Sequence, residues 1–142
     1  MEASEILIEK LKEFEGFRRS AYRDVAGVLT IGYGHTGRDV REGDSITPYW
    51  GEQLLLIDLK KHEAAVRRLN VVRTQGQFDA LVSLSFNIGI GRLMRSTLLR
   101  VIRSGGSKTQ IRRQFKRWIY AGGKPLSGLV RRREWEARRF FE

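Results

Sequence analysis

The sequence of 142 residues contains no cysteine, two prolines and only two histidines, His35 and His62. Without cysteine the chain has no disulfide bond, no thiolate nucleophile and no zinc site of the Cys/His type. We therefore expect no metal and no other cofactor. With 41% hydrophobic residues, a chain of this length can bury a core of its own and form one domain. His62 lies within a helical pattern and is expected to be a half-buried surface residue.

The sequence also lacks a long hydrophobic run. Residues 1–14 alternate charged and apolar side chains, which does not fit the apolar segment of a secretory signal. We expect no signal peptide and no transmembrane segment. The protein is therefore expected to be made in the cytoplasm of the cell that expresses it.

Acidic residues are scarce in the last third of the chain. Residues 1–91 hold 12 Lys+Arg against 13 Asp+Glu, whereas residues 92–142 hold 15 against 3. Such a field attracts nucleic acid, an anionic membrane surface or an anionic bacterial wall, and charge alone does not choose among them. A basic face that is simply solvated is the other interpretation.

Apolar spacing and capping residues predict a mostly helical chain with one β-hairpin. The hairpin covers residues 20–35, and a loop follows at 38–45. Helices are expected from Ser4 to Gly16, from Thr47-Pro48 to about Asn70, from Gln75 to a break at Gly89 and Gly91, from Thr97 to Gly105-Gly106, from Ser107 to about Ile119, and from Ser127 to Phe141.

Three residues of the first helix and the hairpin form a candidate catalytic group. Glu15 ends the helix between Phe14 and Phe17, where the helix dipole and apolar neighbours favour a carboxyl group that keeps its proton. Asp24 lies at the hairpin turn and Thr30 on the return strand. Two carboxyl groups in one site can break a glycosidic bond, although each residue alone also has an ordinary structural explanation.

Several motifs together resemble the phage lysozymes of glycoside hydrolase family 24. The N-terminal motif is the more specific of them and matches without a gap. The matching stretches cover nearly the whole chain and are residues 15–18, 21–24, 27–36, 77–84, 86–89, 117–118, 121–123 and 128–134.

The resemblance implies an α+β, predominantly helical, two-lobed lysozyme-like fold. Residues 1–142 would form a single domain. A β-hairpin lobe of about 15–46 would be joined by a helix of about 47–70 to an all-helical lobe of about 71–142, which also includes the 4–14 helix. The catalytic cleft would lie between the lobes.

The resemblance also implies residue roles. Glu15 matches the general acid, Asp24 the second carboxylate, and Thr30 the residue that helps to hold the attacking water. Gly34, His35 and Thr36 match positions that shape the sugar-binding floor. An arginine approaches the glutamate from behind in the family; among Arg131 to Arg133 we favour Arg132.

The implied activity is hydrolysis of the β-1,4 bond between N-acetylmuramic acid and N-acetylglucosamine in peptidoglycan, with inversion. A monomeric endolysin of this kind acts on the wall after release and uses a holin for access. It binds no specific nucleic acid. The alternatives are a lytic transglycosylase, a catalytically silent peptidoglycan- or nucleic-acid-binding module, and a protein that kills through cationic membrane-active helices.

Overall fold

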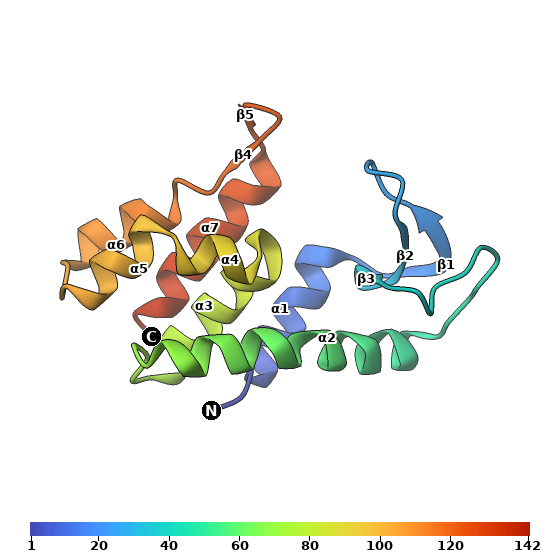
Figure 1. The fold of residues 1–142 in the computed structure, drawn as a ribbon, viewed down its shortest axis with the longest axis horizontal. Coiled ribbons are helices and arrows are strands. Elements are labelled where there is room, and N and C mark those ends of the chain that lie inside the picture. Colours follow the sequence, from blue (N-terminus) through green and yellow to red (C-terminus); the bar gives the residue numbers. More distant parts are fainter. The chain divides into compact units, whose positions relative to one another are not determined.

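A computed structural model describes residues 1–142. Seven helices and five short strands follow one another along the chain (Figure 1). In chain order they are α1 (Glu5–Glu15), β1 (Arg18–Arg23), β2 (Leu29–Gly32), β3 (His35–Thr36), α2 (Pro48–Leu69), α3 (Gln75–Ile88), α4 (Ile90–Met94), α5 (Thr97–Arg103), α6 (Lys108–Phe115), β4 (Tyr120–Ala121), β5 (Lys124–Pro125) and α7 (Ser127–Phe140).

The chain divides into two compact units. The sheet unit is Ile8–Lys60, and the helical unit is Met1–Leu7 together with Lys61–Glu142. The chain passes from one unit to the other within α1 and again within α2. None of the helices combines the length and the apolar character needed to cross a bilayer.

An antiparallel sheet in the order β1-β2-β3 forms the middle of the sheet unit. Arg23 pairs with Leu29 across the first turn, and Thr30 on the central strand pairs with both Tyr22 and Thr36. The predicted hairpin is therefore confirmed, with Asp24 at its turn and Thr30 on its return strand. The two-residue strand β3 was not predicted, since it is too short to show an alternating pattern.

The sheet unit has buried apolar side chains of its own. Ile31 and Val40 are buried together with Leu11, Leu55 and Leu59 from the two helices. Gly51 lets α2 approach closely, because a Cβ atom there would lie only 2.8 Å from the Phe17 ring. Phe17 in turn contacts Tyr33, with 5.3 Å between ring centroids. This packing fixes the end of α1 and the β2–β3 turn, which carry Glu15 and Gly34.

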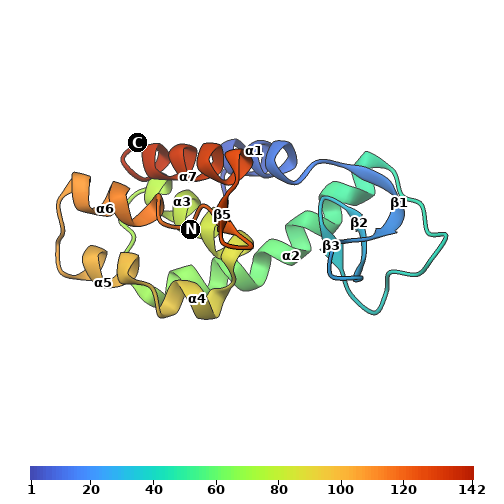
Figure 2. The ribbon, with the colours of Figure 1, turned by 90° about the horizontal axis from the view of Figure 1, so that it is seen from above.

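Helix α3 is the core of the helical unit, and its most extensive packing is against α7. Helices α5 and α6 lie side by side, as Figures 1 and 2 both show. Hydroxyl caps start three of the helices: the Thr74, Ser96 and Ser107 side chains each accept a backbone N–H of the following turn. These local signals made the helix starts predictable.

Three expectations about the helical unit were wrong in detail. The helix expected from Ser107 to about Ile119 ends at Phe115. The break at Gly89 and Gly91 is only partial, since α3 ends at Gly89 and the short helix α4 starts at once and contains Gly91. His62 was expected to be half-buried, yet it is 6% exposed. Its Nδ1 atom lies 2.7 Å from the Ser85 hydroxyl, and its ring meets the edge of Phe86.

Burial has a consequence for the titration of His62. Loss of hydration, with a smaller effect of Lys61, lowers the pKa of His62 from 6.5 to about 4. The folded protein therefore keeps His62 neutral, whereas the unfolded chain takes up a proton below pH 6.5. Because the unfolded state binds more protons, the stability must fall as the pH falls from 6.5 towards 4.

We expect wild type to lose about 2 to 3 kcal/mol more free energy of unfolding between about pH 7.5 and 4.5 than His62→Gln. Glutamine keeps a polar partner for Ser85 and does not titrate. Urea denaturation of both proteins at the two pH values measures the difference. Parallel pH dependences would show that His62 is not the group responsible.

Candidate active site

Glu15 is the last residue of α1 and is half-buried. The helix ends there because Gly16 adopts φ +71° and donates its N–H to the Lys12 carbonyl oxygen at 2.9 Å. The carboxyl group of Glu15 lies against the backbone of Gly34. A Cβ atom on Gly34 would lie 3.2 Å from Glu15 Oε1.

Asp24 is held by the backbone of its own turn. Its Oδ1 atom accepts hydrogen bonds from the N–H groups of Ala26 and Val28, both at 2.9 Å. The N–H of Asp24 donates to the Val28 carbonyl oxygen at 3.0 Å, and Gly27 donates to the Asp24 carbonyl oxygen. These bonds leave the side chain with little rotational freedom and fix where its second oxygen lies.

Thr30 is connected to the same turn. Its side chain is buried, and its hydroxyl donates to the Val28 carbonyl oxygen at 2.9 Å. The proton of the hydroxyl is thus used, so the Oγ1 lone pairs remain to accept a hydrogen bond. The backbone of Val28 therefore contacts both Asp24 and Thr30, a role that its apolar side chain gave no reason to predict.

His35 lies between two carboxylates. Its Nδ1 atom is 2.8 Å from Asp58 Oδ2 on α2, and its Nε2 atom is 3.0 Å from Asp39 Oδ2. Burial disfavours the charged ring, but the two carboxylates outweigh it and raise the pKa of His35 above 6.5. The hydrogen bond between Asp39 and His35 lowers the pKa of the Asp39 carboxyl group. Both ring nitrogens are thus engaged inside the sheet unit.

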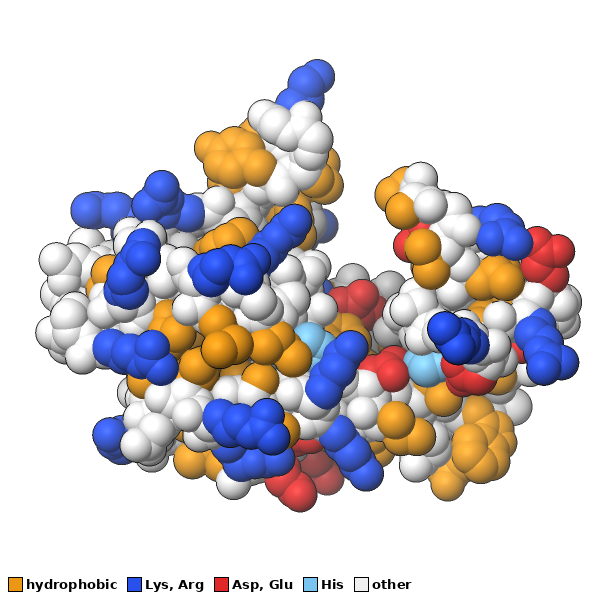
Figure 3. Space-filling view, in the orientation of Figure 1, with side chains coloured by type: hydrophobic (Ala, Val, Ile, Leu, Met, Phe, Trp, Pro, Cys, Tyr) orange, Lys and Arg blue, Asp and Glu red, His pale blue; other side chains and the backbone are white.

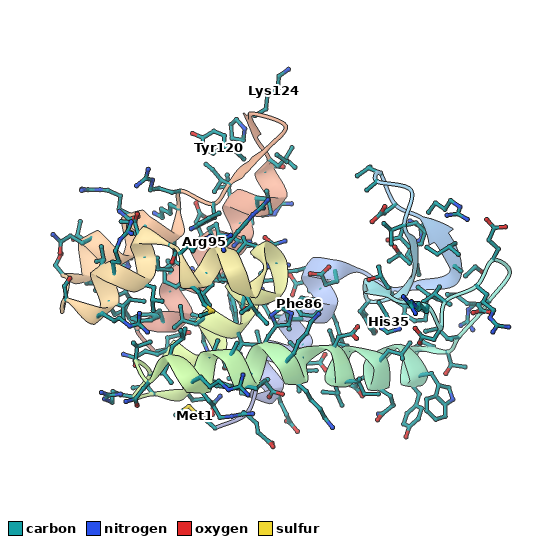
Figure 4. All side chains as sticks on the ribbon, viewed as in Figure 1. Met1, His35, Phe86, Arg95, Tyr120 and Lys124 are labelled. Carbon is teal, nitrogen blue, oxygen red and sulfur yellow. The ribbon has the colours of Figure 1, made fainter.

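Gly34 and Thr36 flank this histidine and are both exposed. Thr36 pairs with Thr30, so it lies directly beside a candidate catalytic residue. Figure 4 labels His35 beside the strands that carry these residues. The structure thus places the three predicted substrate-binding residues on one short stretch of the sheet unit. Asp39 and Asp58, which hold His35, were not predicted because they are distant from it in sequence or lie in a loop.

The helical unit shows how its three consecutive arginines differ. Arg131 is exposed, whereas Arg132 and Arg133 are buried. Arg132 donates to the Ser83 carbonyl oxygen at 2.9 Å and to Glu136 at 3.3 Å. The predicted arginine is therefore one of two that packing holds in place.

Glu136 is the acidic centre of this cluster. It is fully buried, lies 3.2 Å from Arg133, and accepts the Ser83 hydroxyl at 2.5 Å. Burial raises the pKa of Glu136 although Arg133 and Arg132 oppose the rise. Burial likewise lowers the pKa of Arg133. Neither Ser83 nor Glu136 was predicted as part of a site.

Comparisons with known proteins agree over almost the entire chain. Residues 12–136 match the family described as Phage lysozyme. An endolysin of Bacillus phage B103 is 41% identical over 144 residues, which cover 99% of this chain and 54% of that protein. A SAR-endolysin of bacteriophage PS119 is 41% identical over 125 residues, covering 86% of this chain and 73% of that protein. The chain thus spans about half the length of the Bacillus phage relatives that it matches.

Solved structures share the fold. The muramidase domain of SpmX from Asticaccaulis excentricus has a TM-score of 0.90 and 37% identity, covering 99% of this chain and 98% of that one. An endolysin from Escherichia coli O157:H7 phage FAHEc1 has a TM-score of 0.89 and 37% identity, covering 100% and 94%. The expected α+β, mostly helical, lysozyme-like fold is thereby confirmed.

The contact between Gly34 and Glu15 can be tested with a matched pair of substitutions. Gly34 and Gly43 both have positive φ, +81° and +86°, but a Cβ atom at Gly43 would meet nothing within 4 Å. Each Gly→Ala change should cost about 1 to 2 kcal/mol of stability through backbone strain. Only Gly34→Ala should also shift the ¹³C resonance of the Glu15 carboxyl carbon. If the Glu15 carboxyl resonance is the same in Gly34→Ala and Gly43→Ala, the contact between Gly34 and Glu15 is contradicted.

Proposed function

Because the chain belongs to the phage lysozyme family, we propose that it hydrolyses the β-1,4 bond between N-acetylmuramic acid and N-acetylglucosamine in bacterial peptidoglycan. One observation carries the proposal. The backbone of Val28 binds both Asp24 and Thr30, on the same sheet unit that holds Glu15 against Gly34. A carboxylate and a hydroxyl acceptor that are both fixed by the backbone of one residue suit the binding of a water molecule.

In the proposed mechanism Glu15 donates its proton to the departing sugar oxygen. Asp24 accepts a proton from a water molecule. The Thr30 Oγ1 atom accepts a hydrogen bond from the other O–H of the same water. The water then attacks the anomeric carbon from the face opposite the leaving group, which inverts the configuration. The positive charge that develops on the sugar ring is stabilised by the Asp24 carboxylate.

Gly34, His35 and Thr36 are proposed to form the floor under the sugar. The backbone of Gly34 and the exposed Thr36 side chain would contact the substrate. His35 would keep this segment in place through Asp58 and Asp39. For Arg132 we keep the supporting role that the resemblance implies.

The biological setting of the proposed activity is lysis of a bacterial host. The protein would act as a monomeric endolysin on the wall after release, with a holin giving access to it. SAR-endolysins are among the relatives. We keep the single lysozyme domain that the resemblance implies, with about 15–46 as hairpin lobe, about 47–70 as connecting helix, and about 71–142 plus the 4–14 helix as helical lobe.

Replacing the proposed proton donor tests the proposal. Glu15→Gln removes the proton donor and should lower the rate of peptidoglycan solubilisation by about 10²- to 10⁴-fold. Glu13→Gln is the matched control, since Glu13 lies on the same helix with a 69% exposed side chain. Turbidity clearing and the release of reducing ends, measured on the same walls, should show the loss only for Glu15→Gln.

The products of the same reaction separate hydrolysis from its alternatives. Hydrolysis gives muropeptides with a reducing end, whereas a lytic transglycosylase gives 1,6-anhydro products that mass spectrometry distinguishes by the mass of one water molecule. Anhydro products from wild type would contradict the hydrolytic assignment. Equal clearing by wild type and Glu15→Gln would instead indicate a non-enzymatic or membrane-active protein.

The hydroxyl of Thr30 can be tested separately from its packing. Thr30→Val keeps the shape of this buried strand residue and removes the hydroxyl, whereas Thr30→Ser keeps the hydroxyl. Thr30→Val should lower kcat about ten- to hundredfold, the value of one hydrogen bond to the reacting water. Thr30→Ser should retain most activity. If the two variants are equally active, Thr30 does not hold the water.

A further inference from the structure

A basic hollow lies in the helical unit, away from every residue of the proposed catalytic group in sequence. Its volume is about 360 Å³, and it lies among α4, α5 and the end of α6. Its lining includes Arg92, Arg95, Thr97, Gln114, Arg117 and Trp118. Figure 4 labels Arg95, which follows α4.

The three arginines of this hollow carry uncompensated charge. All three are exposed, none forms an ion pair, and no acidic residue lines the hollow. Figure 3 shows the same imbalance on the face in view, where the side chains over α4 to α6 include many in blue and none in red. Arg95 folds back over α4, since a Cβ atom added at Gly91 would lie 3.3 Å from Arg95 Nη1.

A second hollow in the same unit shows that this is not a general property of the basic surface. It has about 220 Å³ and is lined by Arg112, Lys116 and Arg138, but also by Glu134. Arg112 is further engaged with the Phe141 ring. The arginines of the first hollow have neither kind of partner and are available to a ligand.

We propose that the hollow formed by Arg92, Arg95 and Arg117 binds a phosphodiester segment of an anionic bacterial wall polymer. Guanidinium groups form bidentate hydrogen bonds with phosphate oxygens and keep their charge at any physiological pH. The face of Trp118 offers an apolar surface to the polyol or sugar that links successive phosphates. The choice of a wall polymer rests on the proposed function, because that activity brings the protein to the wall.

The charge and the volume of the hollow favour a ligand with repeating phosphates over one with a single carboxylate. One guanidinium already satisfies both oxygens of a carboxylate, whereas three arginines, two from α4 and its C-cap and one from the turn after α6, match several charged oxygens. A volume of about 360 Å³ is in the range that holds a ligand of many atoms rather than one small anion. Gln114 and Thr97 add neutral polar groups that can bind linking hydroxyls.

A binding experiment tests this site independently of catalysis. The full chain carrying Glu15→Gln is titrated with a short poly(glycerol phosphate) and followed by ¹H–¹⁵N NMR. We expect the largest shifts at the backbone amides of Thr97 and Gln114 and at the Trp118 indole N–H. In the same background, Arg92→Gln, Arg95→Gln and Arg117→Gln together should weaken binding at least tenfold at about 0.1 M salt.

The matched control replaces three other exposed arginines, Arg68, Arg103 and Arg113, by glutamine, which removes the same charge outside the hollow. This control should bind within about twofold of its parent. Equal weakening by both triple variants would overturn the site, because net charge alone would then explain binding. Tighter binding to duplex DNA or to phosphatidylglycerol vesicles than to poly(glycerol phosphate) would overturn the choice of polymer.

The outcome is separable from that of the proposed activity. If the hollow only binds the wall polymer, the variant with Arg92, Arg95 and Arg117 replaced loses polymer binding. Its substitutions then leave the hydrolysis of isolated, phosphate-free peptidoglycan unchanged. A failure of Glu15→Gln to reduce hydrolysis would contradict the activity and leave the binding result standing. Hydrolysis of phosphate-free peptidoglycan that falls with the triple variant would contradict the proposed role of the hollow.

Discussion

The hydrogen bonds of the Val28 backbone, made by its N–H and by its carbonyl oxygen, are the interaction on which the proposed site depends. Its N–H fixes Asp24 Oδ1, and its carbonyl oxygen accepts both the Asp24 N–H and the Thr30 hydroxyl. The backbone of one residue thus sets the position of a carboxylate and the direction of a hydroxyl. A backbone group performs this task without a rotatable side chain, so the arrangement exists before substrate binds.

Charge is distributed differently in the two units, and each arrangement has a physical cause. In the sheet unit, Asp58 and Asp39 hold His35 and keep its segment in register. In the helical unit, Ser83 joins two members of the buried cluster of Arg132, Arg133 and Glu136, because its hydroxyl donates to Glu136 and its carbonyl oxygen accepts from Arg132. Removing one member of a buried cluster leaves an uncompensated charge, which costs several kcal/mol. Exposed arginines near α4 and α5 are free of that constraint and can serve binding.

The sequence predicted those parts of the molecule that local signals determine. Ser4, Thr47 and Ser107 start helices through their hydroxyls, and the Asp24 turn with Gly27 makes the hairpin. Apolar spacing and turn residues also placed Glu15, Asp24 and Thr30 on elements that the structure confirms, and the resemblance gave their roles. Their catalytic roles stay a prediction, since the elements place the residues without showing their chemistry.

The parts that were missed depend on contacts between distant residues. His62 reads as an amphipathic helix residue, but Ser85 and Phe86 bury it. Val28 has an exposed side chain, and only its backbone matters. Strands β3, β4 and β5 have two residues each, too few for any periodic pattern, and α4 starts directly after a glycine that ends the preceding helix. Tertiary structure, not local preference, decides all of these.

The stereochemistry of the first product tests the central claim most directly. If Asp24 and Thr30 hold a water molecule that attacks opposite the leaving group, ¹H NMR of wild type acting on a soluble glycan fragment will show the α anomer first, followed by slow mutarotation. An initial β anomer would mean that Asp24 attacks the sugar itself, and it would contradict the account in which Val28 fixes these two residues as a water-binding pair.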